Sequence, residues 1–335
     1  MWIRRHPVLA IVGSLLAVLV VPVAITQLTR REPAARPGPR LDLHDMEFEE
    51  VQFTNPEEGI QLAGMLFVPR GEGPFPTVVV IQGSGTSRRL NSWYLTFVDD
   101  LERHGIAVLL PDKRGSEGSG GDWHTASFQD LATDTLAAIS YLTEERPRLT
   151  SAIGIMGMSQ GGHIAPLVAT SSVRVAFVVD VVGSTLPMYD VLHYEESHNL
   201  RQMGVLPGFS GGLAYLTTFI LRNVTQRPFW SAVGDFDPLP AWRDVDVPAL
   251  VVYGEDDTNV PSAKSRDRLL ELGKPNIRVV VFPGSGHALQ PPAGLGSTYV
   301  REDALTLIHD FILSAATTST GAAPRVPTEP HAPIT

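Results

Sequence analysis

Short runs of apolar and β-branched residues recur along this chain, with segments of helical spacing between them. A run that is apolar on both alternating faces is typical of a strand buried on both sides. Such runs occur at 77–81, 106–110, 153–158, 175–181, 249–253 and 278–282, after an opening pair of strands at 46–53 and 60–68. Helical spacing fits 92–104, 128–142, 161–169 and 301–313. The pattern predicts an α/β fold, with a mostly parallel central sheet and helices on both faces.

One segment interrupts this alternation. About 60 residues, at 184–245, separate the strand at 175–181 from the strand at 249–253, which is far longer than an ordinary connection. Helical stretches are predicted within it at 189–203 and 212–223. Ligands of open parallel sheets bind at the carboxyl ends of the strands, where this segment leaves the sheet. We therefore expect a helical cap over a binding site.

The two ends of the chain differ from its middle. An apolar run at 8–25 is flanked by arginines, which predicts a membrane anchor or a cleaved signal peptide over residues 1–29; a buried core helix is the remaining alternative. An anchor or a signal would make the protein an exported one, held on the membrane outside the cytoplasm or released as a secreted or periplasmic protein. Residues 30–45, rich in Pro and Arg, predict a linker, and residues 315–335 predict a disordered tail.

Composition excludes several classes of function. The chain has 335 residues and no cysteine, so it has neither disulfides, a thiolate nucleophile nor a metal site built on cysteine. Its formal net charge of −10 argues against a nucleic-acid partner, which requires a basic surface. The length allows one large domain or two small ones.

The strongest chemical signal is the sequence Gly-Met-Ser-Gln-Gly at 157–161, directly between a predicted strand and a predicted helix. Glycines two residues before and after a serine allow a tight strand-to-helix turn that exposes the hydroxyl. We expect Ser159 to be a nucleophile and the backbone N–H of Gln160 to face a developing oxyanion. A structural serine in a glycine-rich turn is the alternative.

A serine nucleophile requires a base, and His287 is the best placed histidine. It follows the last predicted strand in a Gly-rich loop, at the edge where the strands end. His124, in another Gly-rich loop, could line the same site. A carboxylate should orient the base, and Asp256 and Asp257 both qualify, because both follow the strand at 249–253.

The loop after the strand at 77–81 could supply a second oxyanion donor. Its sequence, Gln-Gly-Ser-Gly-Thr at 82–86, lets the backbone approach a substrate closely. We expect the N–H of Ser84 to be this donor, with Gly85 as the alternative. An ordinary Gly-rich connection would look the same.

These motifs resemble those of the α/β-hydrolase superfamily, over about residues 47–314. Residues 80–85 are similar to its strand followed by His-Gly-Ser-Gly, with Gln82 in place of the histidine, and 111–121 are similar to its Asp-x-Arg-Gly-x-Gly-x-Ser loop. Residues 254–261 resemble Gly-x-x-Asp-x-x-Val-Pro, which places the catalytic acid on Asp257. The resemblance looks closest to bacterial esterases related to dienelactone hydrolases or serine peptidases. It implies one α/β-hydrolase domain over 46–314, including the cap.

The resemblance also implies an activity. Ser159, Asp257 and His287 would form a catalytic triad, and Ser84 and Gln160 an oxyanion hole, for acyl transfer to water without a metal or an organic cofactor. We expect a serine hydrolase that cleaves a small acyl ester. A peptidase or thioesterase of the same fold is the first alternative, and a non-catalytic binding protein on this scaffold is the second.

Overall fold

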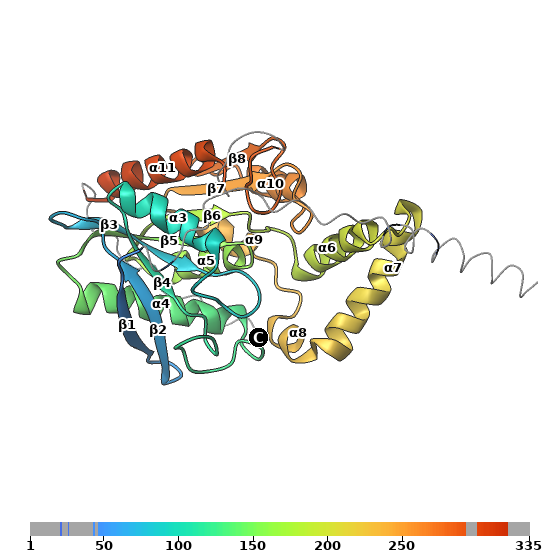
Figure 1. The fold of residues 1–335 in the computed structure, drawn as a ribbon, viewed down its shortest axis with the longest axis horizontal. Coiled ribbons are helices and arrows are strands. Elements are labelled where there is room, and N and C mark those ends of the chain that lie inside the picture. The colour runs from blue at the N-terminus through green and yellow to red at the C-terminus, as the bar shows by residue number, and fades with distance from the viewer. Residues whose placement is uncertain (1–20, 22–25, 27–42, 44–45, 293–299, 321–335) are drawn as a thin grey trace, which may run out of the picture.

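One sheet of eight strands organises the computed structural model, which describes residues 21, 26, 43, 46–292 and 300–320 (Figure 1). The strand order is β1-β2-β4-β3-β5-β6-β7-β8. β2 pairs antiparallel with both β1 and β4, and the remaining neighbours are parallel. The bounds are β1 Glu49–Asn55, β2 Ile60–Phe67, β3 Phe75–Ile81, β4 Ala107–Pro111, β5 Thr150–Met158, β6 Val175–Val181, β7 Ala249–Gly254 and β8 Ile277–Phe282. The predicted α/β class is confirmed.

Helices cover both faces of the sheet because both faces of the central strands are apolar. In β3, Val79 and Ile81 join one core, with α4 (Phe128–Glu145) and α5 (Gly161–Ser171). Val78 and Val80 join the other core, with α3 (Ser92–Arg103) and α11 (Glu302–Thr320). The continuous apolar runs therefore supply both cores by simple alternation.

The predicted cap is a set of helices between β6 and β7. Its members are α6 (Met188–Gln202), α7 (Pro207–Ile220), the π-helical turn η2 (Leu221–Thr225), α8 (Arg227–Val233) and α9 (Leu239–Asp244). α6 and α7 stand out from the sheet, whereas α9 packs against α5 and buries Trp242 in the main core (Figure 1). The last helix of the segment, α9, is thus part of the layer of helices that covers the sheet. Helix α10 (Ser262–Glu271) follows β7.

Two predicted boundaries are wrong. The first strand begins at Glu49 and not at residue 46. Helix α11 continues to Thr320, and Ala315 and Ala316 are buried, so the disordered tail cannot begin at residue 315. Their Ala/Thr composition suggested a tail, but alanine is a strong helix former and packs closely on a neighbouring surface.

The predicted anchor, linker and last residues fall almost entirely outside the described residues. Of the segment 1–45, only residues 21, 26 and 43 are described. Residues 321–335 are not described at all. Within the described part of the chain, no helix combines the length and apolarity that a bilayer crossing needs. The proposals for these segments stay predictions.

Candidate active site

Ser159 occupies a sharp turn between β5 and α5. Its φ is +53°, a left-handed conformation that L-residues rarely adopt, and its N–H donates to the carbonyl of Val181. A Cβ on Gly157 would lie 2.5 Å from the carbonyl oxygen of Gly161, and one on Gly161 would lie 2.1 Å from that of Ile81. The two glycines are therefore required by close backbone contacts, as the motif predicts.

His287 connects Ser159 to a carboxylate. Its Nε2 lies 2.9 Å from Ser159 Oγ, and its Nδ1 lies 2.8 Å from Asp257 Oδ2. The other oxygen of Asp257 accepts the N–H groups of Asn259 and Val260, at 2.8 and 2.9 Å. The structure thus brings together the three residues that the sequence predicts.

The alternative acid, Asp256, is not part of this chain of contacts. Its side chain is exposed, and its backbone N–H donates to the carbonyl of Ser285. Asp257, by contrast, is only 2% exposed. Of the two neighbouring aspartates, the loop after β7 turns Asp257 inward and Asp256 outward.

Two further elements contact the loops that carry Asp257 and His287. The indole N–H of Trp93, on α3, donates to the carbonyl of Ala288 at 3.2 Å, and the Trp93 ring lies 5.9 Å from that of His287. Tyr194, on cap helix α6, donates its hydroxyl to the carbonyl of Asp257 at 2.8 Å. The cap is therefore joined directly to the acid loop.

The loop after β3 places candidate donors beside Ser159. The N–H of Gly83 is already used, because it donates to Tyr94 Oη at 2.8 Å. Among the described residues, no protein acceptor is found for the backbone N–H of Ser84 or of Gln160. Both residues line the cavity around Ser159, as an oxyanion hole requires, whereas Gly85 lines only the neighbouring cavity.

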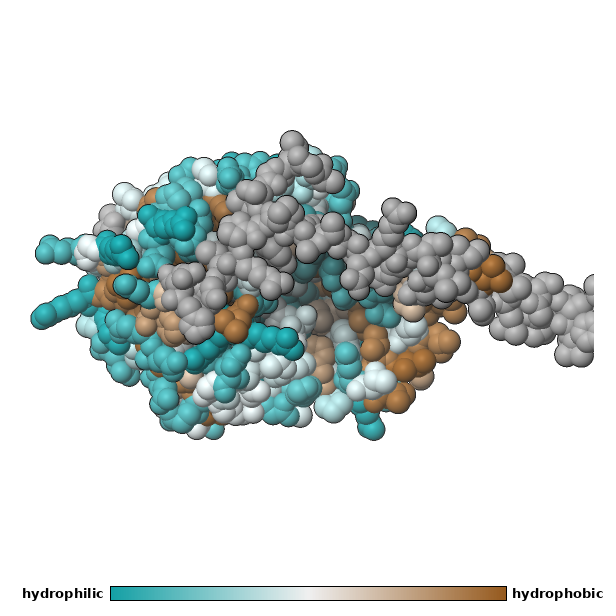
Figure 2. Space-filling model, in the orientation of Figure 1, coloured by the Kyte–Doolittle hydropathy of each residue, from teal (hydrophilic) through white to brown (hydrophobic). Residues whose placement is uncertain are grey.

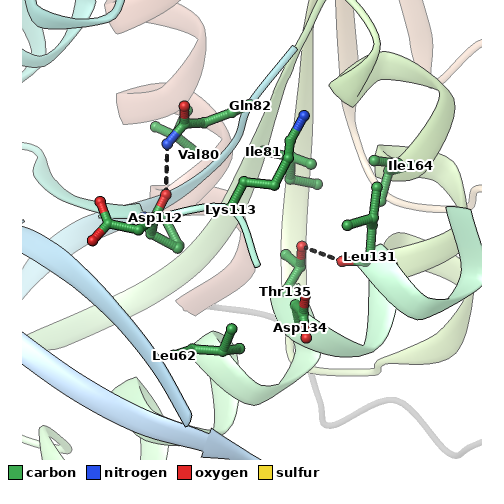
Figure 3. Close-up of a pocket in the computed structure, with 11 residues that line it drawn as sticks. Leu62, Val80, Ile81, Gln82, Asp112, Lys113, Leu131, Asp134, Thr135 and Ile164 are labelled. Carbon is green, nitrogen blue, oxygen red and sulfur yellow. Dashed lines mark hydrogen bonds between the residues drawn. The ribbon is translucent and has the colours of Figure 1, made fainter. Parts of the chain in front are cut away.

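The same loop rests on two side chains that the sequence analysis did not select. Gln82, which replaces the histidine of the resembling family, donates its amide to the carbonyl of Pro111 at 2.6 Å (Figure 3). The ammonium of Lys113 donates to the carbonyl oxygens of Gly83 and Gly85. Burial lowers the pKa of Lys113 to about 7. Lys113 follows β4, and β4 is the neighbour of β3 in the sheet. The order of the strands is therefore the signal that could have placed Lys113 beside this loop.

Two adjoining cavities open above Ser159. The nearer one, of about 280 Å³, is lined by Ser84, Ser159, Gln160 and His287 together with cap residues. The second, of about 700 Å³, shares Ser84 and Gln160 and extends beneath the cap. Its apolar lining comes largely from Trp123, Met188, Val191, Leu192, Leu221, Pro228, Phe229 and Trp230.

The charges around these cavities are acidic. Asp122, Glu195 and Glu196 line the larger cavity, and no arginine or lysine among the described residues lines either cavity. Burial raises the pKa of Glu195, whose carboxylate accepts the amide of Asn259 at 2.9 Å. His124 lines the larger cavity as well, stacked on Trp123 at 3.8 Å, so it lies beside the site and not at the nucleophile.

One cluster with metal-ligand chemistry lies elsewhere, between α3 and α11. It consists of Asp100, His104 and His309. The two imidazole rings are stacked at 3.6 Å, and each offers Nδ1 to an oxygen of Asp100. None of the three residues lines the cavities at Ser159.

Comparison with known proteins supports the assignment of this fold. A family model described as BAAT / Acyl-CoA thioester hydrolase C terminal matches residues 136–294, which include Ser159, Asp257 and His287. A model described as X-Pro dipeptidyl-peptidase (S15 family) matches residues 58–208. The structure of an esterase from Pyrococcus furiosus, 19% identical, matches with a TM-score of 0.62 over 85% of this chain and 100% of its own.

The chain belongs to the α/β-hydrolase superfamily. Among curated relatives of this α/β-hydrolase, Esterase EstD of Thermotoga maritima is 23% identical over 72% of the chain and 63% of its own length. A peroxisomal succinyl-coenzyme A thioesterase of Mus musculus is 27% identical over 68% of the chain and 52% of its own length. The chain thus spans about half to two thirds of these relatives.

Proposed function

We propose that this α/β-hydrolase is a serine hydrolase that cleaves carboxylic esters through an acyl-enzyme. The observation that carries the proposal is the position of His287, within hydrogen-bond distance of both Ser159 Oγ and the buried carboxylate of Asp257. The esterase, thioesterase and peptidase relatives support hydrolase chemistry at the coarser level.

The proposed reaction has two halves. Ser159 Oγ attacks the ester carbonyl while His287 Nε2 accepts its proton, and the negative oxygen is stabilised by the N–H groups of Ser84 and Gln160. The tetrahedral intermediate collapses when His287 returns the proton to the departing alcohol. Water then enters, His287 accepts its proton, and the same donors stabilise the second intermediate as the acid is released.

Electrostatics favour an uncharged ester over a coenzyme A thioester. Coenzyme A carries several phosphate charges, and a site that binds it needs cationic side chains. Within the described part of the chain, the cavity linings include Asp122, Glu195 and Glu196 but no lysine or arginine. The apolar lining of the larger cavity suits the hydrocarbon part of an acyl ester.

The decisive experiment is hydrolysis of a panel of p-nitrophenyl esters of increasing acyl length. We expect turnover by the wild-type chain and a loss of at least about a thousandfold in kcat for Ser159→Ala, with the folded structure retained. A fluorophosphonate should label the wild-type chain and not this variant. Unchanged turnover in Ser159→Ala would contradict the assignment of the nucleophile, and the absence of both turnover and labelling would favour a binding protein.

A further inference from the structure

Helix α7 of the cap buries small side chains and exposes large apolar ones. Its buried residues are Ser210, Ala214 and Thr218, which are small and share one helical face. Its large apolar side chains point to solvent instead: Phe209 (39% exposed), Tyr215 (70%), Leu216 (55%), Phe219 (60%) and Ile220 (40%). A surface helix in water normally buries such residues. Figure 2 shows brown, hydrophobic residues gathered at the end of the molecule where α7 lies.

Polar contacts hold α7 in this orientation. Arg201 of α6 donates from Nε to Ser210 Oγ at 3.0 Å, and His193 Nε2 lies 3.1 Å from the carbonyl oxygen of Gly211. The His193 ring also packs 4.2 Å from that of Tyr215. Rotating α7 to hide its apolar face would break these polar contacts. The outward apolar face, here called the α7 face, is therefore built into the cap.

The composition of the α7 face matches a lipid surface. Helix α7 contains no charged residue, and Val224 of the following turn adds a side chain that is 67% exposed. The shared feature with helices that lie in the bilayer interface is the apolar face, where aromatic and aliphatic side chains are buried at the boundary between headgroups and acyl chains. An exposed apolar area of this kind in a water-soluble region marks an interaction surface.

The sequence supplies a reason why a bilayer would be close by. The apolar run at 8–25 predicts a membrane anchor, and only residues 26–45 separate it from the described domain. Twenty residues span at most about 70 Å, so an anchored domain would stay near the lipid. Tethering raises the effective concentration of a weak contact, so a small apolar face suffices. We propose that the α7 face rests on the lipid bilayer to which residues 8–25 attach the chain.

This arrangement would also present the active site to lipid. The chain runs from α7 into η2 and α8, and Leu221, Pro228 and Phe229 of these elements line the larger cavity. An apolar acyl ester could then reach the cavity from the membrane side. The net charge of −10 disfavours anionic lipid, so we expect contact with zwitterionic phosphatidylcholine to be at least as strong.

The absence of native cysteine makes a direct test possible in the full-length chain. A fluorophore is attached to Leu216→Cys, and in a matched control to Val173→Cys. Val173 is 51% exposed in the wild-type chain and precedes the amino end of β6, whereas the cap leaves from the carboxyl end of that strand. Each chain is reconstituted in phosphatidylcholine vesicles with or without a nitroxide quencher on the lipid. We expect quenching at position 216 to exceed that at position 173 at least threefold.

Two results would overturn this proposal. The first is equal quenching at both positions, which would place the α7 face away from lipid. The second is protection of position 216 by a second copy, seen as a crosslink between cysteines at 216 with no quenching. If Leu216→Cys fails to fold, Val224→Cys provides the same measurement, because it lies on the same face.

An independent observation concerns Lys113, and it depends on the proposed function. The Gly83–Ser84 peptide bond is trans, so its C=O and N–H point in opposite directions. Lys113 donates to the C=O of Gly83, so the N–H of Ser84 points away from the ammonium, and Ser84 lines the cavity of Ser159. An ammonium at the carbonyl oxygen also strengthens that N–H as a donor. We infer that Lys113 is a positioning residue that orients and polarises the oxyanion donor.

The other charged groups near Lys113 are already paired or neutral. Asp112 binds Arg89 at 2.8 Å and Asp134 binds Arg114 at 2.7 Å, and both carboxylates line the small cavity that Lys113 enters. Figure 3 shows Asp112 and the ammonium of Lys113 pointing in different directions. Burial raises the pKa of Tyr94, so its hydroxyl stays neutral near pH 7. The charge of Lys113 is therefore available to the loop.

Kinetics of Lys113→Met and Lys113→Arg test this role. We expect kcat to fall about 10- to 100-fold in the Met variant with KM within about twofold, because the donor acts in the transition state. The Arg variant should recover part of the loss, and Lys264→Met, on the exposed side of α10, should match wild type. Wild-type kcat should also decline as pH rises through about 7, where Lys113 loses its proton.

Unchanged kcat and pH dependence in a folded Lys113→Met chain would overturn the inference. If that variant fails to fold, a wild-type kcat that stays level above neutral pH would do the same. Failure of the proposed function looks different, since it would remove turnover and fluorophosphonate labelling from the wild-type chain itself.

Discussion

Single residues at the site differ in how far their proposed roles could be predicted from the neighbouring sequence. Ser159 and His287 were predictable because each sits in a short motif at the carboxyl end of a predicted strand. Asp257 and Asp256 were indistinguishable by location, and only the family's spacing favoured Asp257. Tyr94 and Lys113 escaped prediction, because their contacts with Gly83 depend on how α3 and β4 pack beside the loop.

The two aspartates provide a matched pair of variants. Asp257→Asn should lower kcat by about 10⁴-fold, because an amide favours the wrong tautomer of His287 and cannot stabilise the imidazolium. Asp256→Asn should leave kcat within about twofold, since that side chain is exposed. Steady-state kinetics on one p-nitrophenyl ester compares them. Equal losses in both variants would show that the acid has been misassigned.

At the scale of elements, strands were more predictable than helix ends. Runs such as 175–181 reappear unchanged as β6, because a strand buried on both faces has a strong compositional pattern. Helix α7 begins at Pro207, five residues before the predicted start at 212, because Pro207 and the glycines after it concealed the first turn. Proline is well suited to a first helical turn, so its presence there was a signal of the start.

The junction between β6 and α5 makes stability depend on pH. Burial raises the pKa of Asp180 to about 8, above its value of about 3.9 in an unfolded chain. The folded protein therefore retains a proton there, and the stability that this proton supplies is full below about pH 4 and is lost as pH rises through about 8. Asp180→Asn mimics the protonated form and cannot lose it.

Denaturant unfolding of Asp180→Asn across this pH range measures the effect. We expect the free energy of unfolding of the variant, relative to wild type, to rise by a few kcal/mol between pH 5 and pH 9. The exposed Asp256→Asn serves as the control and should show no such trend. A difference that stays constant with pH would mean that Asp180 is ionised in the folded protein.

At the scale of the whole molecule, we expect charge to discriminate between the substrates of the proposed hydrolase. The chain has a net charge of −10, and the cavity linings are acidic. Sequence composition predicted the first property but not the second, because the cap brings Glu195 and Glu196 over the site only in three dimensions. The relatives that this chain resembles are named as an esterase and a thioesterase, so the resemblance alone does not select one substrate.

Ionic strength tests this electrostatic selection. An acyl-coenzyme A and a neutral p-nitrophenyl ester with the same acyl group are compared between about 0.01 and 0.2 M salt, a range over which the Debye length falls from about 30 to less than 10 Å. We expect kcat/KM for the thioester to rise about 2- to 10-fold with salt, and that for the ester to change less than twofold. A thioester rate that falls with salt would reveal a cationic binding region.

The left-handed backbone of Ser159 has a thermodynamic consequence. A side chain at φ +53° costs of order 1 kcal/mol that glycine does not incur, so the fold is less stable with the proposed nucleophile at this position. Ser159→Gly should therefore unfold at a higher temperature than Ser159→Ala, although both lack the hydroxyl, and calorimetry can compare them. If Ser159→Ala proves the more stable, the turn is relaxed. If Ser159→Gly is the more stable, one substitution both removes the proposed nucleophile and stabilises the fold. The proposed activity would then be maintained at a cost in the free energy of folding.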